Sequence, residues 1–524
     1  MPPKSTPAWF KCSGYVHLTN KISNQQFAEI ERKVTNKAWV SRHAFFPLLK
    51  KTVKTRRYKK MGYSPEGQPI RDHFNDKKQE SNVKNRPIEY ATHIDSLIFS
   101  YYAKEVLAPV YEAELRNTEG LSDCVTAYRK MPIEQDSLSC KSNIHFAAEV
   151  FEHIKERGEC VAMAFDIESF FPSLDHKELK KAWAKLFGQT ALEADHFNVF
   201  KAATRYSHID IDDLRVREVK KHQRKAGFDE QKLAHLRTQN IHAFFESPKE
   251  MREAIKNGDI PLHVNKKGKG IPHGLPISAS LANLYMLAFD KAILQDIVKR
   301  YGAFYRRYSD DIIIVCDTKD YLGIKNFVLT EIQKSQLTIS ADKTEICFFS
   351  YQNGKLSVER EVTTMEGKTI LKPNMPLVYL GFEFYGHKTL IKSANVAKFY
   401  RRMKKAIKSK VNFAKKSMLK QGREEDDFIL FERKLKRIYT HLGARSRKWT
   451  TTKTVYKFDK TEQRHKPHRI PKPNGKDIYK EYRGNTLAYV YRASETMNES
   501  AIRKQFKRHF KIYSAYVEKV KNKI

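Results

Sequence analysis

Cysteine is scarce in this chain and follows no recognisable pattern. Six cysteines occur among 524 residues, and no two of them have the Cys-x-x-Cys spacing of a zinc knuckle. Their spacing also gives no disulfide framework, so we expect reduced thiols in a cytoplasmic protein. The six are Cys12, Cys124, Cys140, Cys160, Cys316 and Cys347.

Long apolar runs are missing as well. No stretch approaches the length that a helix needs to cross a membrane, and the first residues lack the apolar core of a signal peptide. The sequence therefore predicts no membrane partner. Hydrophobic residues still make up 40% of the chain and aromatic residues 12%, which is typical of a folded protein with a sizeable core.

Acidic residues are too few to balance the basic ones. The chain has 98 Lys and Arg against 60 Asp and Glu, which gives a formal net charge of +38. The excess is concentrated near the end, where 38 Lys and Arg stand against 12 Asp and Glu from Lys392 to Ile524. Because so basic a surface repels itself unless a polyanion covers it, the charge predicts nucleic acid as a partner.

Two adjacent acids form the first candidate site. Asp310 and Asp311 stand between an aromatic run, Phe304–Tyr308, and an apolar run, Ile312–Val315. The two runs predict paired strands with the acids at the tip of the hairpin. Adjacent carboxylates repel each other, and a site that keeps both ionised usually holds a cation. Taken alone, the pair fits a solvated turn equally well.

A third acid stands in a matching position. Asp166 ends a short apolar strand and precedes a helix predicted from His176 to about Phe187. If this strand lies beside the hairpin, Asp166, Asp310 and Asp311 converge. Three carboxylates with open positions for substrate oxygens suit two Mg²⁺ ions that bridge a triphosphate.

A loop rich in Gly and Pro lies between these acids. The run Gly270-Ile-Pro-His-Gly274 leads into a helix predicted to begin near Ser278, and Asn283 follows five residues later. Such a loop lets the backbone and a helix N-terminus approach a flat or anionic ligand closely. An ordinary connector before a core helix would have the same features.

In this order, the three segments resemble the motifs of reverse transcriptases. Phe165-Asp-Ile-Glu-Ser-Phe-Phe171 is similar to the first-aspartate motif, Gly270–Gly274 to the Gly-x-Pro-x-Gly motif, and Tyr308–Asp311 to the Tyr-x-Asp-Asp motif. Further matches extend the resemblance over roughly residues 80–390. They cover the fingers motifs, the palm motif that carries a lysine and the primer-grip hairpin, at Asn85–Ile88 with Asp95, Ala127–Lys130, Leu337–Glu345 and Val378–Phe382.

The resemblance implies an α+β fold of the right-hand polymerase type. Its fingers–palm core has an antiparallel palm sheet with helices, and a helical thumb and C-terminal domain follow. The boundaries we expect are an N-terminal extension at 1–80, fingers at 81–158, a palm at 159–390 with an insertion at about 188–265, and a basic helical region at 391–524.

The resemblance also implies an enzyme, an RNA-directed DNA polymerase that uses dNTPs, two Mg²⁺ ions and an RNA template to make a DNA product. The metals would be bound by Asp166, the Ile167 carbonyl, Asp310 and Asp311. Lys343 would protonate the leaving pyrophosphate, although a local ion pair explains this lysine equally well.

The remaining expected roles concern the nucleotide. The resemblance implies that Phe171 is a steric gate against a 2′-hydroxyl, which predicts deoxynucleotide use. The triphosphate would be clamped by cations, each of which also fits an ordinary exposed side chain, and the pocket would be bordered by the Gly/Pro loop. These residues are Arg86, Arg129, Lys130, His273 and Gly274.

Two departures from the family pattern concern the loop and the C-terminal region. His273 and Leu275 stand where the motif usually has Gln and Ser, which leaves the nucleotide contacts open.

The long insertion and basic C-terminal region resemble bacterial defence-associated and abortive-infection reverse transcriptases. That resemblance implies a cytoplasmic bacterial protein in antiviral defence with a noncoding RNA, and DNA synthesis that is non-templated or primed by a protein hydroxyl. A homo-oligomer stays open.

Outside the motifs, the sequence predicts a small helical lobe near the N-terminus, a surface loop from Lys50 to Pro69, and a loop or arm at Ala444–Lys476. Helical spacing is found at Ile94–Leu115, Asn143–Arg157, Pro248–Lys256, Ala394–Leu419, Asp426–Leu442 and Glu499–Val520.

Two other function classes stay open from the sequence. A non-catalytic RNA-binding or maturase-like protein would use the same basic surface without needing the three acids. A C-terminal ribonuclease is the other, because Arg503 and His509 fit the loose Arg-x₄₋₆-His pattern of one helical nuclease class.

Overall fold

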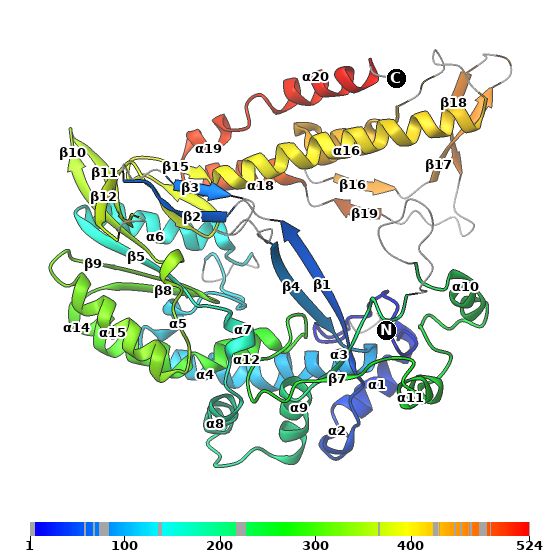
Figure 1. Cartoon of the computed structure of the whole chain (residues 1–524), viewed down its shortest axis with the longest axis horizontal. Coiled ribbons are helices and arrows are strands. Elements are labelled where there is room, and N and C mark those ends of the chain that lie inside the picture. Colours follow the sequence, from blue (N-terminus) through cyan, green and yellow to red (C-terminus); the bar gives the residue numbers. More distant parts are fainter. Residues whose placement is uncertain are drawn as a thin grey trace. The chain divides into compact units, whose positions relative to one another are not determined.

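The computed structural model of the chain (Figure 1) divides into two compact units. Unit 1 contains residues 1–131, 159–348 and 359–373, and unit 2 contains residues 132–158, 349–358 and 374–524. Both units mix helices with antiparallel strands, which confirms the expected α+β class. The residues described are 6–56, 59–65, 69–72, 83–134, 139–215, 227–364, 367–422, 428, 430–444, 447–450, 453–459, 461, 464–470, 479–482 and 484–522.

A six-stranded sheet of order β12-β11-β10-β5-β9-β8 carries the predicted acids. The apolar runs on either side of the acids form the expected strands, and β9 pairs antiparallel with both β5 and β8. The four residues Ile312–Val315 are completely buried, as expected for a central strand covered on both faces. The strands are β5 (Cys160–Asp166), β8 (Phe304–Tyr308), β9 (Asp311–Cys316), β10 (Glu345–Gln352), β11 (Lys355–Thr363) and β12 (Thr369–Pro373).

Helices of unit 1 build a large apolar core with this sheet. The predicted helix after Asp166 is α8 (His176–Leu186), and Asp175 caps it by accepting the N–H groups of Lys177 and Glu178 at 2.8 and 3.1 Å. The others are α1 (Phe27–Val34), α2 (Lys37–Arg42), α3 (His93–Tyr101), η2 (Tyr102–Leu107), α4 (Ala108–Asn117), α5 (Leu121–Cys124), α7 (Phe170–Ser173), α9 (Ala194–Thr204), α10 (Glu230–Thr238), α11 (Pro248–Lys256), α12 (Ser278–Tyr285), α13 (Leu287–Ile293), η3 (Leu294–Val298), α14 (Lys299–Tyr301), α15 (Tyr321–Lys334) and η4 (Ala341–Lys343), with the short η1 (Asn24–Gln26) before α1.

The N-terminal region and the insertion fold together within unit 1. A four-stranded sheet of order β4-β1-β6-β7 joins β1 (Leu48–Arg56) and β4 (Val83–Tyr90) to β6 (Ser207–Asp210) and β7 (His263–Val264). A small separate core combines residues from both regions, namely Leu18, Leu49, Ile209, Phe245, Met251 and Ile260. The insertion therefore supports the N-terminal residues and is not an independent appendage.

The predicted surface loop from Lys50 to Pro69 is wrong. Its first part is the strand β1, which forms a long ribbon with β4 from Leu49 opposite Tyr90 to Arg56 opposite Val83 (Figure 1). The next described part is β2 (Lys59–Tyr63), paired with β3 (Pro69–Asp72). A ribbon with solvent on its faces needs no apolar alternation, because cross-strand hydrogen bonds hold it. This is why its basic composition misled the prediction.

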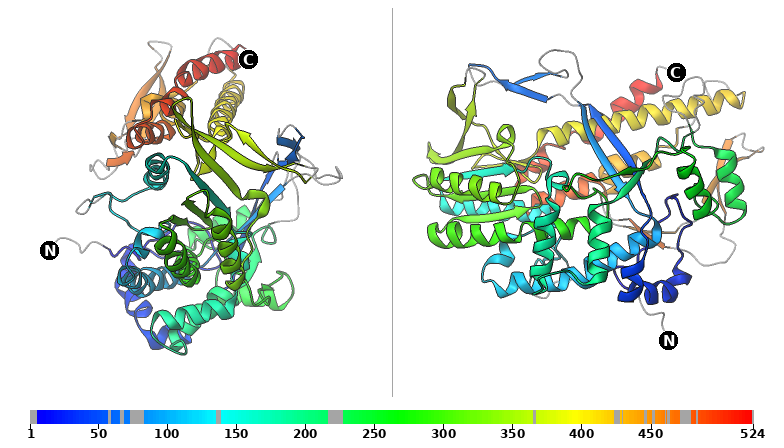
Figure 2. Two further views of the ribbon diagram at one scale, coloured as in Figure 1. Left: turned by 90° about the vertical axis from the view of Figure 1, so that its left-hand side faces the viewer. Right: turned by 60° about the horizontal axis from the view of Figure 1, so that its bottom comes forward.

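Unit 2 is built on a long basic helix, α16 (Ser393–Lys420), which Figure 2 shows without interruption. The expected hairpin at Val378–Phe382 is present as β13 (Leu377–Tyr379) and β14 (Phe382–Phe384), with β15 (Thr389–Ile391) beside β14. The predicted helix α6 (Asn143–Arg157) also belongs to this unit, with α17 (Arg433–Tyr439), η6 (His441–Gly443), α18 (Thr486–Thr496), α19 (Ser500–Lys504) and α20 (His509–Lys521).

Three predictions for unit 2 need correction. The loop or arm at Ala444–Lys476 contains strands, β16 (Arg447–Thr450), β17 (Lys453–Asp459) and β18 (Arg464–Ile470), and β16 pairs with β19 (Tyr479–Tyr482). The helix expected at Asp426–Leu442 is reduced to α17 and η6, and part of its start lies outside the described residues. The helix expected at Glu499–Val520 is split into α19 and α20. In the gap the Gln505 side chain bonds both backbone groups of Ile391, at 2.8 and 2.9 Å.

In the part of the chain that the structure describes, no helix is both long enough and apolar enough to cross a membrane.

Candidate active site

The three predicted acids lie at one end of the paired strands β5 and β9. Asp166 stands opposite Asp311 in this antiparallel register, and Asp311 stands opposite Tyr308 in the β8–β9 hairpin. Residues opposite each other in such a pair project from the same face of the sheet. Asp310 lies in the turn just before β9, and its carbonyl accepts a hydrogen bond from the Ile167 N–H at 3.4 Å. Strand pairing therefore brings the three acids to one site.

The turn that presents Asp310 has an unusual backbone. Ser309 has a φ of 62°, in the left-handed region, and its side chain is buried. Its hydroxyl lies 3.0 Å from the Tyr128 hydroxyl, and its carbonyl accepts a hydrogen bond from Arg307 at 3.1 Å. A residue other than glycine persists in this conformation only when its surroundings fix it. These two contacts supply that constraint.

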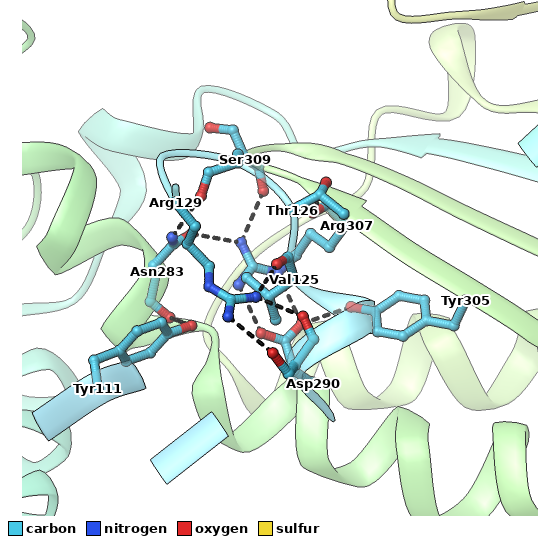
Figure 3. A network of polar contacts seen from close by, with 11 residues as sticks. Tyr111, Val125, Thr126, Arg129, Asn283, Asp290, Tyr305, Arg307 and Ser309 are labelled. Atoms are coloured by element: carbon cyan, nitrogen blue, oxygen red, sulfur yellow. Dashed lines mark hydrogen bonds and ion pairs between the residues drawn. The ribbon is translucent and has the colours of Figure 1, made fainter. Parts of the chain in front are cut away.

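A buried ion pair lies beneath the turn (Figure 3). Arg307 and Asp290 are both fully buried, and the guanidinium donates to the two carboxylate oxygens at 2.7 and 2.6 Å. The Tyr305 hydroxyl donates to the same carboxylate at 2.6 Å, and Asn283 accepts from Arg307 at 3.2 Å. Burial lowers the pKa of Arg307, but the Asp290 carboxylate more than offsets this, so the pKa is raised and the guanidinium stays charged.

The network also reaches the segment that precedes Arg129. The N–H and the hydroxyl of Thr126 both donate to the Arg307 carbonyl at 3.0 Å, and the Asn283 amide donates to the Ala127 carbonyl at 2.9 Å. The β8 strand, α12 and this segment are thereby held together directly behind the acids. The turn that carries Asp310 therefore rests on a network of polar contacts.

The Arg129 guanidinium is engaged by groups of the protein itself. Its guanidinium donates to both carboxylate oxygens of Glu112 at 2.7 Å and to the carbonyls of Ser122 and Val125 at 2.5 Å. The side chain is only 6% exposed. Arg129 therefore ties its segment to α4, whereas the neighbouring Lys130 is exposed.

Lys343 lies at the acids, as the resemblance implied. It ends the short helix η4, and its ammonium forms an ion pair with the Asp166 carboxylate. The backbone is joined at the same place, because the Ser340 N–H donates to the Asp166 carbonyl at 2.8 Å. The lysine side chain is half exposed, so it remains open to solvent and to a bound substrate.

The Gly/Pro loop is fixed against two neighbouring segments by close backbone contacts. Gly274 has a φ of 122°, and a Cβ at this position would lie 2.6 Å from the Glu89 carbonyl oxygen. Gly270 has a φ of 86°, and a Cβ there would lie 2.8 Å from the Pro172 carbonyl oxygen. Both positions therefore require glycine. Reciprocal bonds between Glu89 and His273 hold the loop to β4, at 2.7 and 3.2 Å.

Phe171 and His273 form one wall of the site. Their ring centroids are 4.6 Å apart, and both side chains are half-buried, while Phe170 is buried in the core. Burial lowers the pKa of His273, Asp310 raises it, and Arg86 with Lys84 lowers it again, with a net downward shift. The ring is therefore neutral near pH 7. The exposed Arg86 on β4 lies within electrostatic range of this ring, which is also within range of Asp310.

The donor set at the acids suits a hard divalent cation. Carboxylates and a backbone carbonyl are the oxygen ligands that Mg²⁺ prefers, and the Lys343 ammonium already shows that a positive charge fits beside Asp166. The three acids do not form a closed cage among the described residues. Mg²⁺ usually keeps waters and takes substrate phosphates as further ligands, so an open set of acids fits it.

A different set of side chains has compact metal-ligand spacing, and it serves the fold. Among the described residues, the ligand atoms of Glu193, Asp195 and His196 lie within 4.8 Å of one another. The Trp183 N–H donates to His196 Nδ1 at 3.3 Å, which puts the remaining ring proton on Nε2. The Tyr102 hydroxyl donates to Asp195 at 2.6 Å. Trp183 thus takes the His196 Nδ1 lone pair, and Lys37 pairs with Glu193 at 2.7 Å, so two of the three side chains are already engaged within the protein.

His509, the residue named for a C-terminal ribonuclease, also has a structural role. It is buried, its Nδ1 lies 2.7 Å from the Phe506 carbonyl, and its Nε2 accepts the His441 N–H at 3.2 Å. Arg503, the other half of the nuclease pattern, pairs with Glu495 at 2.6 Å. Both ring nitrogens of His509 are therefore engaged within the protein, and the bond from His441 joins α20 to η6.

Sequence reasoning missed the residues that support the site. Asp290 and Arg307 carry no motif signal, and Arg307 resembles any other cation in a basic chain, while Tyr128 lies in a matched motif that gave it no role. The available clue was the alternation of β8, where Tyr305 and Arg307 fall on the same face. An arginine on the buried face of a strand needs an acid, which Asp290 supplies.

Residues 225–384 match the family model described as "Reverse transcriptase (RNA-dependent DNA polymerase)". The chain thus contains a segment that matches a reverse transcriptase domain. The matched segment includes His273, Gly274, Asp310, Asp311 and Lys343 and begins after Asp166. No curated protein sequence matches the chain.

Solved structures similar to this chain include two yeast telomerases. A C-terminally truncated apo telomerase from Candida tropicalis is 9% identical with a TM-score of 0.34, covering 71% of this chain and 61% of that one. A telomerase from Candida albicans bound to a fragment of telomeric RNA is 14% identical with a TM-score of 0.33. That match covers 74% of this chain and 54% of the telomerase chain. The chain thus spans less than two thirds of the length of these two telomerase chains.

Proposed function

We propose that the chain, which carries a reverse transcriptase domain, synthesises DNA from dNTPs at the site formed by Asp166, Asp310 and Asp311. The observation that carries this proposal is the register of β5 and β9, which sets Asp166 opposite Asp311. In the reaction, a primer 3′-oxygen attacks the α-phosphorus of the dNTP. The bond from that phosphorus to the bridging oxygen breaks, and pyrophosphate leaves.

Two Mg²⁺ ions would be held by Asp166, Asp310, Asp311 and the Ile167 carbonyl. Reverse transcriptase domains use divalent metal ions, and such ions supply a lowered pKa for the attacking hydroxyl and stabilisation of charge on the phosphates. The protein's own contribution is to hold the carboxylates ready. The Arg307–Asp290 ion pair beneath Ser309 fixes their spacing before substrate arrives.

Lys343 is the proposed proton donor to the leaving pyrophosphate. Its ammonium pairs with Asp166, so it stands beside one of the carboxylates that would hold metal. A metal ion bound at Asp166 would compete with this ion pair and would leave the lysine available to the phosphates. Arg86 and Lys130 are the proposed triphosphate contacts because both are exposed. Arg129 is left out because Glu112 occupies its guanidinium.

Phe171 is the proposed selector for deoxynucleotides. Its ring packs against His273 at 4.6 Å, which limits its movement away from the sugar. His273 replaces the Gln expected in this motif, and the neutral ring offers one donor and one acceptor to the nucleotide. Gly274 lets the loop backbone approach β4 and keeps this wall in place.

The basic region of unit 2 is the proposed contact for template and product. The exposed side of α16 carries many lysines and arginines, while Phe399, Met403, Ile407 and Val411 are buried. A helix of this kind suits a phosphate backbone. The partners we propose are an RNA template or a resident noncoding RNA, and the DNA product.

A role in bacterial antiviral defence is proposed on the resemblance alone, and so is a cytoplasmic location. The sequence features behind it are the insertion at about 188–265 and the +26 balance that follows from 38 basic and 12 acidic residues after Lys392. Phage plating on cells with the wild-type chain or the Asp310→Asn/Asp311→Asn variant tests it. Equal plaque counts for the two strains would rule out a role that depends on polymerisation.

The direct test of the polymerase is an incorporation assay. The purified protein, with the nucleic acid it retains, is incubated with each labelled dNTP and Mg²⁺, beside the Asp310→Asn/Asp311→Asn variant. We expect a DNase-sensitive product only with the wild type, and RNase and protease treatment shows whether RNA templates it and a protein hydroxyl primes it. Bound RNA with no product from any nucleotide would instead favour an RNA-binding protein.

A ribonuclease at the C-terminus is the weaker alternative. His509 has both ring nitrogens engaged within the protein. We expect His509→Gln to leave the integrity of added RNA unchanged.

A further inference from the structure

A cavity of about 310 Å³ lies away from the acids, between the loop that follows α2 and the end of α9. None of its lining residues belongs to the site proposed for polymerisation. One wall is aromatic, formed by His43, Phe45, Phe46 and Phe99 with Tyr206. A volume at the lower end of the range for small-molecule sites holds one base with its sugar, but no duplex.

The aromatic wall is held rigidly. The fully buried Asp95 accepts a hydrogen bond from His43 Nε2 at 2.7 Å and from the Phe46 N–H at 3.0 Å. The amide of Asn198 donates to the carbonyls of Val40 and His43 at 2.8 and 2.9 Å. The loop is therefore tied to α3 and α9 from both sides. Because the wall exists before any ligand binds, ordering it adds little to the cost of binding.

The rings of this wall form two stacked pairs that meet edge to face, with the planes of His43 and Phe45 79° apart. Phe45 stacks on Phe99 with centroids 5.1 Å apart and planes 29° apart, and His43 stacks on Trp39 at 4.6 Å with the same angle. Bases stack on such faces whatever their sequence, because every base has a π face. The cavity thus offers aromatic contact without base-specific demands.

The charged side chains at the cavity are basic. Lys201 and Arg205 both line it from the last turn of α9 and its C-terminal end, and both are exposed. No acid is among the lining residues, and no carboxylate ion pair with either cation is found in the described part of the chain. Two cations beside an aromatic cavity match a phosphate attached to a base.

We propose that this cavity binds one nucleotide, with the base among the aromatic side chains and the phosphate on Lys201 and Arg205. The nucleotide is either a free mononucleotide or one unit of a single-stranded nucleic acid. The site is built jointly by the N-terminal region and the insertion, and it gives both a binding role. It does not depend on the acids, so it is tested without any polymerisation.

Three variants separate the parts of the site. Lys201→Ala/Arg205→Ala removes the phosphate contacts. Ala202→Leu keeps every charge and fills the cavity from its helical wall, where leucine is a good helix former. The matched control is Lys177→Ala/Lys185→Ala, which removes two exposed cations from the neighbouring α8 and leaves the cavity unchanged.

Two measurements on the full chain, freed of bound nucleic acid, use these variants. Calorimetric titration compares AMP and UMP with ribose 5-phosphate and inorganic phosphate. Photocrosslinking with a six-nucleotide RNA that contains 5-iodouridine, followed by peptide mapping, shows where a strand places its base. The Asp310→Asn/Asp311→Asn variant is included, and it is expected to behave as the wild type.

If the ligand is a free nucleotide, we expect AMP and UMP to bind at least tenfold more tightly than ribose 5-phosphate. Both cavity variants should lose this difference and the control should keep it. If the ligand is one unit of a strand, we expect crosslinks within residues 43–46 or 201–206, and both cavity variants should reduce these crosslinks at least tenfold. In that case AMP and UMP alone should show no binding in the calorimetric titration. The proposal is overturned if binding shows no dependence on the base and the crosslinks avoid these segments, or if Ala202→Leu changes neither readout.

Discussion

Removing Arg307 should damage both the stability and the activity of the protein. In the Arg307→Met variant the Asp290 carboxylate stays completely buried and keeps, among the side chains that the structure describes, only the Tyr305 hydroxyl as a donor at 2.6 Å. Breaking a buried ion pair by deleting one partner costs about 3–5 kcal/mol, because a charge is left without its counter-ion. We expect a loss of this size in the free energy of unfolding of unit 1, measured by urea denaturation.

A double variant separates stability from activity. Arg307→Met/Asp290→Leu removes both charges and refills the space with apolar groups, a change that is often neutral for stability. Most of the loss in unfolding free energy should therefore return. The hydrogen bond to the Ser309 carbonyl is still missing, so the turn that presents Asp310 is less fixed. We expect dNTP incorporation by the double variant to stay at least tenfold below the wild type.

The control for this experiment is Lys291→Met, which removes a partly exposed cation that pairs with Glu114. Exposed ion pairs contribute little to stability, so the free energy of unfolding of this variant should differ from the wild type by less than about 1 kcal/mol. A single Arg307→Met variant with wild-type stability would refute the assigned burial cost. A double variant with wild-type incorporation would show that the network does not position the acids.

Three further changes have defined outcomes. Gly274→Ala puts a Cβ at 2.6 Å from the Glu89 carbonyl, so incorporation should fall and stability should drop by about 1–3 kcal/mol; Gly188→Ala, which also has a positive φ but open space around it, is the matched control. Phe171→Val should raise ribonucleotide incorporation relative to dNTPs in single-nucleotide assays, and an unchanged ratio would remove the steric-gate role. Burial lowers the pKa of His17 to about 3, so the unfolded state takes up the proton first as the pH falls below about 6.5. The free energy of unfolding should therefore fall by about 1.4 kcal/mol for each pH unit between pH 6.5 and pH 3. Urea denaturation measured over this pH range should show that the His17→Gln variant lacks this contribution to the pH dependence.

The sequence was sufficient for the parts of the site that lie on continuous motifs. Strands at Phe304–Tyr308 and around Ile312–Val315 follow from runs of apolar and aromatic residues, because a buried central strand needs them on both faces. Asp166 and Asp311 then fall at strand ends, and their register partnership follows once the two strands are neighbours. The reverse transcriptase domain was also visible from the motifs, and the family match confirms it.

Local composition was a poor guide where pairing across a distance decides the structure. The basic residues of β1 and of β17 and β18 gave no apolar alternation, yet these segments pair as ribbons. Backbone hydrogen bonds hold such strand pairs together, so the pairing does not require a periodic apolar pattern. The partners of Arg129 and His509 could not be read from the sequence for a related reason, because a charged or titratable side chain does not reveal there which residue it meets.

The sequence by itself determined that this is a basic, α+β protein with a reverse transcriptase domain and three acids set at strand ends. Only the tertiary structure decided which cations face the substrate and which serve the fold. Arg307 lies against Asp290, and Arg129 lies against Glu112, while Lys343 reaches Asp166. The physical reason is that an ion pair depends on two residues meeting in space, often far apart in the chain, and burial then fixes whether the charge is available to a ligand.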